Sequence, residues 1–175
     1  MASFALDLDL SEYRGPLDAQ AVRAVFSSSL EAYLGEAPSD EWGFWSDFEG
    51  PVWSVSVWAG RWADSHLESE DSQAEVQQVG QRDLRVVLGR GVGQGELAAV
   101  LAHEVAHVAQ HVEGSMPALL AASAGRAWEA QPLEQDAVQR SAEWVLSVDP
   151  ESLGLSRRVW RHAEARAEWE LQQME

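Results

Sequence analysis

The sequence contains no cysteine, and it also lacks lysine, asparagine, threonine and isoleucine. Without cysteine the chain cannot form disulfide bonds, iron–sulfur clusters, thiolate nucleophiles or cysteine-type zinc fingers. Any bound metal must therefore be held by histidine and carboxylate side chains.

Positive charge is also scarce. Twelve basic residues stand against 29 acidic ones, which gives a formal net charge of -17. Such a field repels phosphate backbones and anionic lipid surfaces, so we expect neither a nucleic-acid nor a membrane partner. A peptide or protein partner that is neutral or cationic is compatible with this charge, and the composition leaves the oligomeric state open.

Long hydrophobic runs are missing as well. No stretch reaches the roughly 18 apolar residues of a membrane-spanning helix. The segment Met1–Tyr13 has no basic residues, and Asp7 and Asp9 interrupt it where a signal peptide needs an apolar run. We therefore expect a cytoplasmic protein, and 175 residues are enough for one domain spanning residues 1–175.

Hydrophobic periodicity predicts an α+β fold, with a small N-terminal sheet and a helical C-terminal half. Alternating or β-branched segments predict strands at 4–10, 52–58 and 83–88. Helical spacing predicts helices at 16–34, 95–113, 117–129, 132–148 and 156–173. The polar stretch 64–78 is expected to be a loop, and the tryptophans at 42, 45, 53, 58 and 62 are interpreted as core residues in preference to an exposed binding surface.

The segment Glu96–Gly114 contains the pattern His103-Glu104-Val105-Ala106-His107. Four residues advance a helix by about 400°, so the two imidazoles project from nearly the same side, one turn apart, and can bind one metal ion. Glu104 lies about 100° away, off the metal but within reach of a water beside it, where a general base is needed. The surrounding helix is apolar on nearly all sides, which predicts that it is buried.

A catalytic zinc site normally has a third protein ligand. His111 is too far along the helix, about 12 Å from His103. Glu113 occupies the position of the third histidine in the pattern HExxHxxGxxH, but Gln110 replaces the glycine that turns that chain. Glu134 opens the apolar face of a later helix and is the preferred candidate, although an exposed acidic residue at a helix N-terminus explains it equally well. Asp136 is the reserve.

Two segments resemble a known family. Glu96–Val108 (ELAAVLAHEVAHV) resembles the active-site helix of the HtpX and CAAX-prenyl-protease gluzincins, and Leu133–Pro150 (LEQDAVQRSAEWVLSVDP) resembles that family's later helix. The stretches HVAQH and PLEQDA are similarly close to the zincin-like domains associated with bacterial contractile injection systems. This resemblance implies a zincin-like fold with His103, His107 and Glu134 as Zn²⁺ ligands. It departs from the family at Val138, where an aspartate is usual, and Asp136 is a possible substitute.

The resemblance implies a zinc metallopeptidase, most simply an endopeptidase, with Glu104 as the catalytic base. The alternative is a non-enzymatic zincin-like module that binds zinc and a protein partner. Donors considered for the oxyanion are Tyr33, His66, Arg158, Arg161 and His162. A peptide substrate is expected to add as an extended strand to the sheet, along residues 83–88 or 52–58.

Overall fold

The computed structural model describes residues 2–39, 48–68 and 72–175. Within these residues it contains four strands and five α-helices. The strands are β1 (Ala5–Asp9), β2 (Val52–Ala59), β3 (Ala74–Gly80) and β4 (Asp83–Leu88). The helices are α1 (Ala19–Leu34), α2 (Leu97–Val112), α3 (Met116–Ser123), α4 (Pro132–Ser147) and α5 (Arg157–Gln173). The α+β prediction is confirmed, with most of the helices following the strands.

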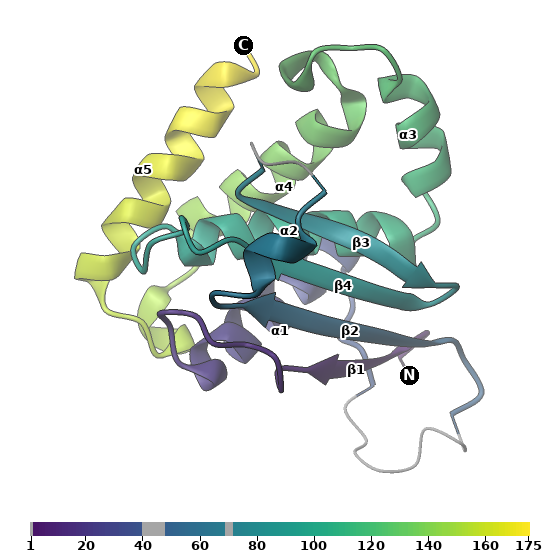
Figure 1. Cartoon of the computed structure of the whole chain (residues 1–175), viewed down its shortest axis with the longest axis horizontal. Helices are drawn as coiled ribbons and strands as arrows, with labels where there is room; N and C mark the ends of the chain where they lie inside the picture. The colour runs from purple at the N-terminus through teal and green to yellow at the C-terminus, as the bar shows by residue number, and fades with distance from the viewer. Residues whose placement is uncertain (1, 40–47, 69–71) are drawn as a thin grey trace.

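The four strands form one mixed sheet in the order β1-β2-β4-β3. Strands β1, β2 and β4 are parallel, whereas β3 pairs with β4 in the antiparallel direction. Figure 1 shows the helices gathered behind this sheet, so the sheet has one face packed against them. In β2 the burial alternates along the strand, with Val55 and Val57 buried in the core.

Helix α1 packs against α2 beneath the sheet. It starts after Asp18, whose side chain accepts a hydrogen bond from the Ala21 amide, and it ends at Gly35 with a φ of 72°. Pro16 therefore precedes the helix, which begins at Ala19. The positive φ is a backbone conformation that glycine adopts at little cost, which explains why the helix stops there.

Helix α2 carries the HExxH pattern and runs through the middle of the core. Every residue from Leu97 to Gln110 is buried, which confirms the prediction that this helix, apolar on nearly all sides, lies in the core. It contacts α1, α4, α5 and the edge strand β3. The central helix thus fixes the position of the two histidines relative to both the sheet and the C-terminal helices.

Two element predictions were wrong. The stretch 64–78, predicted to be a loop, contains the end of a short 3-10 helix (η2, Ala63–His66) and the first part of β3. The strand was not recognised because only Ala74 and Val76 pack against the core, while Glu75, Gln77 and Gln78 are polar. The predicted helix 117–129 ends at Ser123, and Gly125, with a φ of 73°, separates it from the 3-10 turn η3 (Trp128–Ala130).

The interpretation of the tryptophans as core residues holds only in part. Trp53 is buried, but Trp58 and Trp62 are half-buried and contact each other with ring centroids 4.7 Å apart. Trp42 and Trp45 lie outside the described residues. Among the described helices, none has the length and hydropathy needed to cross a membrane.

Candidate metal centre

His103 and His107 lie one turn apart on α2, as the spacing predicts. Their ring centroids are 5.0 Å apart, and each residue is 8% exposed. Two imidazoles in such an environment need polar partners, because an unpaired buried polar group costs roughly 1–3 kcal/mol.

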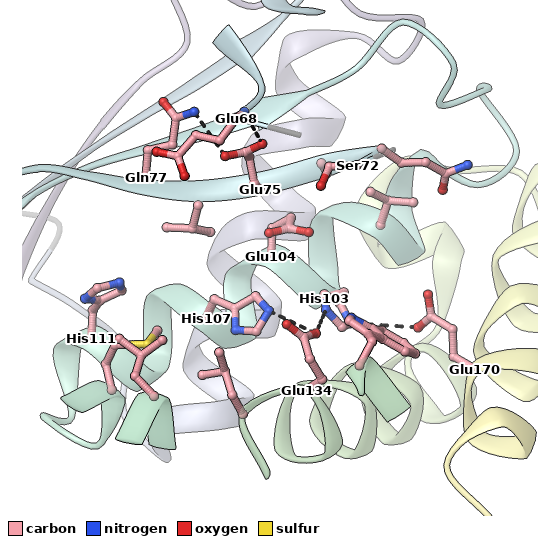
Figure 2. A pocket seen from close by; sticks show the side chains of 18 of the residues that line it. Glu68, Ser72, Glu75, Gln77, His103, Glu104, His107, His111, Glu134 and Glu170 are labelled. Carbon is pink, nitrogen blue, oxygen red and sulfur yellow. Dashed lines mark hydrogen bonds and ion pairs between the residues drawn. The ribbon is translucent and has the colours of Figure 1, made fainter. Parts of the chain in front are cut away.

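The first turn of α4 supplies that partner. Pro132 is the first residue of this helix, a position where proline is favoured because its missing N–H would have no helical acceptor. Oε2 of Glu134, two residues later, lies 3.0 Å from Nε2 of His103 and 3.5 Å from Nε2 of His107. Only 13% of the Glu134 side chain is exposed, so the interpretation of a solvated N-terminal carboxylate does not describe it. Figure 2 shows the carboxylate between the two imidazoles.

The donor set of these three side chains suits a zinc ion. One atom from each of His103, His107 and Glu134 lies within 4.8 Å of the others. Ligands at about 2.0–2.1 Å around a tetrahedral ion are separated by about 3.3 Å, which is close to the two nitrogen–oxygen distances given above. Two histidines and one glutamate also form a common ligand set of catalytic zinc sites.

Glu134 and His107 shift each other's pKa values through a hydrogen bond and opposite charges. Burial on its own would raise the pKa of Glu134, but the hydrogen bonds to both histidines and their charges keep that pKa well below its usual range. Burial would lower the pKa of His107, but the Glu134 hydrogen bond and the charges of Glu104 and Glu134 raise it to about 9. The carboxylate is therefore ionised, and His107 binds a proton in the place where a metal ion would supply positive charge.

A buried glutamine orients His107. Oε1 of Gln110 lies 2.8 Å from Nδ1 of His107, while its amide nitrogen donates to the Leu133 carbonyl at 3.1 Å and to Asp136 Oδ2 at 2.8 Å. Both of those partners are oxygen acceptors, so the amide orientation is fixed and Oε1 faces the imidazole. Nδ1 of His107 is consequently a donor. Nε2, the nitrogen that faces Glu134, is then the one that would bind a metal ion once it has lost its proton.

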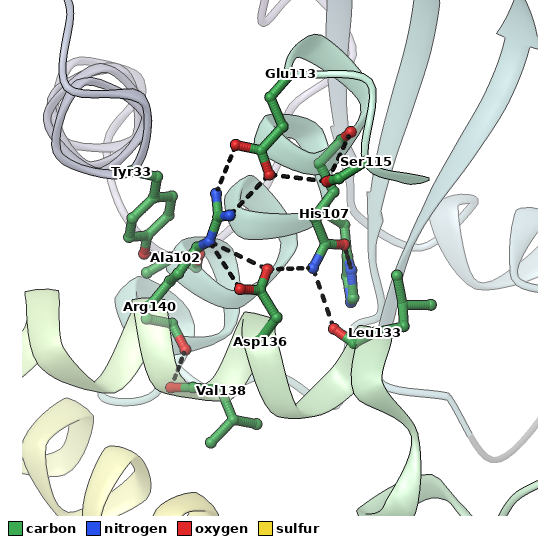
Figure 3. Close-up of polar contacts among 11 residues, drawn as sticks. Tyr33, Ala102, His107, Glu113, Ser115, Leu133, Asp136, Val138 and Arg140 are labelled. Carbon is green, nitrogen blue, oxygen red and sulfur yellow. Dashed lines mark hydrogen bonds and ion pairs between the residues drawn. The ribbon is translucent and has the colours of Figure 1, made fainter. Parts of the chain in front are cut away.

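The other candidates for the third ligand have different partners (Figure 3). Asp136 accepts hydrogen bonds from Gln110 and Arg140, so it supports His107 indirectly and lies outside the group of metal-ligating atoms. Glu113 pairs with Arg140 at 2.7 Å. His111 lines the pocket next to the histidine pair and is likewise outside that group.

Glu104 lies beside the cluster in a cavity of about 730 Å³. Figure 2 shows it on the side of the two imidazoles opposite Glu134. Burial raises its pKa, while the charges of His103 and His107 lower it. The cavity is bounded by β3 along Ala74–Gln78 and by apolar side chains of the helical half, and Trp128 stacks over His103 with ring centroids 6.4 Å apart.

The residues considered for stabilising an oxyanion do not belong to this cavity. Tyr33 donates its hydroxyl to the Ala102 carbonyl at 3.0 Å. His66 contacts the rings of Trp58 and Trp62. Arg158, Arg161 and His162 are exposed, and none of the five is among the described residues that line the cavity. Helix α5 contributes Arg166 to the lining instead, and this arginine was not singled out in the sequence.

The expected substrate edge also needs correction. Strands β2 and β4, the two expected to be edges, lie in the interior of the sheet. Strand β3 is at the edge, and it is the strand that lines the cavity. The sequence could not show this because β3 itself was not recognised, and strand order depends on contacts between distant segments.

Gln110 and Glu170 were missed as well. Gln110 lies three residues after His107, a spacing that places the two on one side of a helix and was a usable signal. Glu170 is buried on α5, and nothing in its local sequence distinguishes it from the exposed glutamates of that helix.

Comparison with protein-family models, curated proteins and solved structures gave no match.

Proposed function

We propose that this protein is a zinc-dependent peptidase with a zincin-like active site, acting as an endopeptidase. The observation that carries the proposal is the arrangement of His103, His107 and Glu134 around one point, with Glu104 beside them in an accessible cavity. A purely structural metal site does not require a buried carboxylate next to its ligands.

In this proposal His103, His107 and Glu134 hold the ion. Bound zinc would supply Lewis acidity, which makes a water molecule more acidic and polarises a peptide carbonyl. Glu104 accepts the proton of the attacking water and then delivers it to the amine that leaves when the C–N bond breaks. Burial raises the pKa of Glu104, which favours its holding the proton between the two steps.

Strand β3 gives the substrate a place to bind. It pairs with β4 on one side, and no described residue pairs with its other side. Its residues Ala74–Gln78 line the same cavity as Glu104, so an extended peptide hydrogen-bonded along this edge would pass the histidine pair. The net charge of -17 favours neutral or basic peptides.

One observation favours a second candidate function, a non-enzymatic zinc-binding module. The donors considered for the oxyanion lie outside the cavity, and Arg166, which does line it, already pairs with Glu170 at 2.9 Å. A metal-binding module with a protein partner needs no such donor.

Zinc-dependent cleavage of an unfolded basic protein tests the proposal. The wild type, supplied with one equivalent of zinc, should generate new N-termini detectable by mass spectrometry. A chelator should abolish them and added zinc should restore them. Glu134→Ala should be inactive, whereas the matched control Glu129→Ala, an exposed glutamate in η3, should cleave like the wild type. Absence of chelator-sensitive cleavage across a diverse peptide library would favour the non-enzymatic module.

A further inference from the structure

The second ring nitrogen of His103 has no hydrogen-bond partner among the described residues, although it is buried. His107 differs, because its corresponding nitrogen contacts Gln110. The two histidines of the proposed site are thus supported unequally. The role inferred below for the residue that faces His103 rests on the metal site of the proposed function.

A buried carboxylate faces this nitrogen from another helix. Oε2 of Glu170, on α5, lies 3.9 Å from Nδ1 of His103, and the glutamate is only 4% exposed. Its other oxygen, Oε1, accepts a hydrogen bond from Arg166 Nε at 2.9 Å. Figure 2 shows Glu170 reaching toward His103 from α5, on the side away from His107. One carboxylate oxygen is therefore fixed by an arginine, and the other is available to the imidazole.

Arg166 is itself held in place. Its Nη1 donates to Oε1 of Gln73 at 2.9 Å and lies 3.6 Å from Oε2 of Glu96, just before α2. Gln73 directly precedes β3. Contacts to two other segments of the chain limit the freedom of Arg166, and they limit that of the Glu170 carboxylate with it.

The chemistry of a ligating histidine indicates what Glu170 does. When Nε2 binds a metal, the neutral imidazole has its proton on Nδ1, and this N–H is nearly always donated to a carboxylate, a carbonyl or a water. Nε2 of His103 faces Glu134, so Nδ1 is the nitrogen that must donate. A buried N–H without an acceptor would cost roughly 1–3 kcal/mol.

We propose that Glu170 is the positioning residue of His103: its carboxylate accepts a hydrogen bond from the Nδ1–H of His103 when Nε2 ligates the metal, and Arg166 holds the carboxylate in place for this contact. The site is then built from three helices. Helix α2 supplies both histidines, α4 supplies Glu134, and α5 supplies the carboxylate that orients His103.

The test compares zinc affinity in Glu170→Gln with that in Glu168→Gln, using competition with a chromophoric chelator. Glu168 is an exposed glutamate on the same helix, so its variant removes the same charge without a contact to the site. Glu170→Gln should weaken zinc binding roughly 10–100-fold, the usual effect of losing such a partner. Glu168→Gln should bind zinc like the wild type.

A spectroscopic measurement separates positioning from a general effect of charge. With zinc bound, the wild type labelled with ¹⁵N in histidine should show a downfield, slowly exchanging Nδ1 proton for His103. In Glu170→Gln that signal should shift upfield or exchange rapidly, while the Nδ1 proton of His107 stays unchanged. If Glu170→Gln does not fold in chelator, Arg166→Gln, which loosens the same carboxylate, must weaken zinc binding in its place.

The outcomes are distinct. Zinc binding by the wild type with equal affinity in Glu170→Gln overturns the positioning role and leaves the proposed site intact. Equal weakening in Glu168→Gln overturns it too, because the effect would then be one of net charge. Failure of the wild type to bind zinc refutes the proposed function, and the role of Glu170 falls with it.

Discussion

Nδ1 of His107 lies 2.8 Å from Oε1 of Gln110, three residues further along the same helix. This contact determines which nitrogen of His107 faces Glu134. Because the amide nitrogen of Gln110 is directed at two oxygen acceptors, the glutamine can only accept from the imidazole. Gln110, which stands where the pattern HExxHxxGxxH has its glycine, thus has a role of its own as a support for His107.

Replacing Gln110 by alanine should weaken zinc binding roughly 10–100-fold, because Nδ1 of His107 loses its acceptor. The variant should also be less stable, since Gln110 is fully buried and its removal leaves a cavity. Gln135→Ala is the matched control: this exposed glutamine donates to the Glu129 carbonyl away from the site. Zinc affinities measured by chelator competition should differ between the two variants, and equal affinities would show that Gln110 does not orient the ligand.

Asp136 acts through Gln110, so its replacement should matter less than that of Glu134. We expect Asp136→Ala to retain close to one zinc per chain after purification, and Glu134→Ala to lose it. Elemental analysis of both variants beside the wild type measures this directly. If Asp136→Ala is the variant that loses metal, the third ligand is Asp136 and the assignment of Glu134 is wrong.

Zinc binding should release protons at neutral pH. In the metal-free protein the pKa of His107 is raised to about 9, so its imidazole carries a proton at pH 7 that zinc must displace. The Glu134 carboxylate is already ionised at that pH and contributes no proton. Affinity should therefore increase as the pH rises and level off near pH 9.

Calorimetric titration at pH 7 in two buffers of different ionisation enthalpy measures this release. We expect about one proton per zinc ion from His107. The same enthalpy in both buffers would mean that no proton leaves, and the proposed coupling of His107 to Glu134 would then be wrong.

Tyr33 should contribute to stability and not to catalysis. Its hydroxyl donates to the Ala102 carbonyl on α2, and neither residue is among those that line the cavity. Removing this hydrogen bond in Tyr33→Phe should lower the free energy of unfolding by roughly 0.5–1.5 kcal/mol. Urea denaturation measures the change, and peptide cleavage by the variant should equal that of the wild type. A loss of turnover without a loss of stability would contradict this expectation and indicate that Tyr33 acts as an oxyanion donor.

The parts of the site that depend on local spacing could be predicted. The separation of four residues placed His103 and His107 side by side, and the apolar surroundings of the helix predicted its burial. These two inferences require only the geometry of a single helix. For Glu134 the spacing favoured neither a ligand nor an exposed N-terminal carboxylate, and the family resemblance made it the preferred third ligand.

What could not be predicted depends on contacts between distant segments. Strand β3 lacks a clear alternation of apolar and polar residues, because it is an edge strand with one weakly apolar face. Its position beside the cavity therefore could not be predicted from the sequence. Glu170 and Arg166 lie among several acidic and basic residues in the sequence of α5, and only the packing of that helix against α2 distinguishes them. For the same reason the sequence did not show that Arg166 lines the cavity, whereas Arg158 and Arg161 do not.

The measurement that tests the central claim most directly is turnover by Glu104→Gln, with zinc content determined on the same sample. The substitution preserves the size of the side chain but removes the proton acceptor, and Glu104 is not among the atoms that would hold the ion. We predict that the variant keeps its zinc and its melting temperature and loses at least about 100-fold in peptide hydrolysis, the lower end of the usual contribution of a general base. Equal hydrolysis by the zinc-loaded variant and the wild type would contradict the assignment of Glu104 as the base and, with it, the proposed peptidase mechanism.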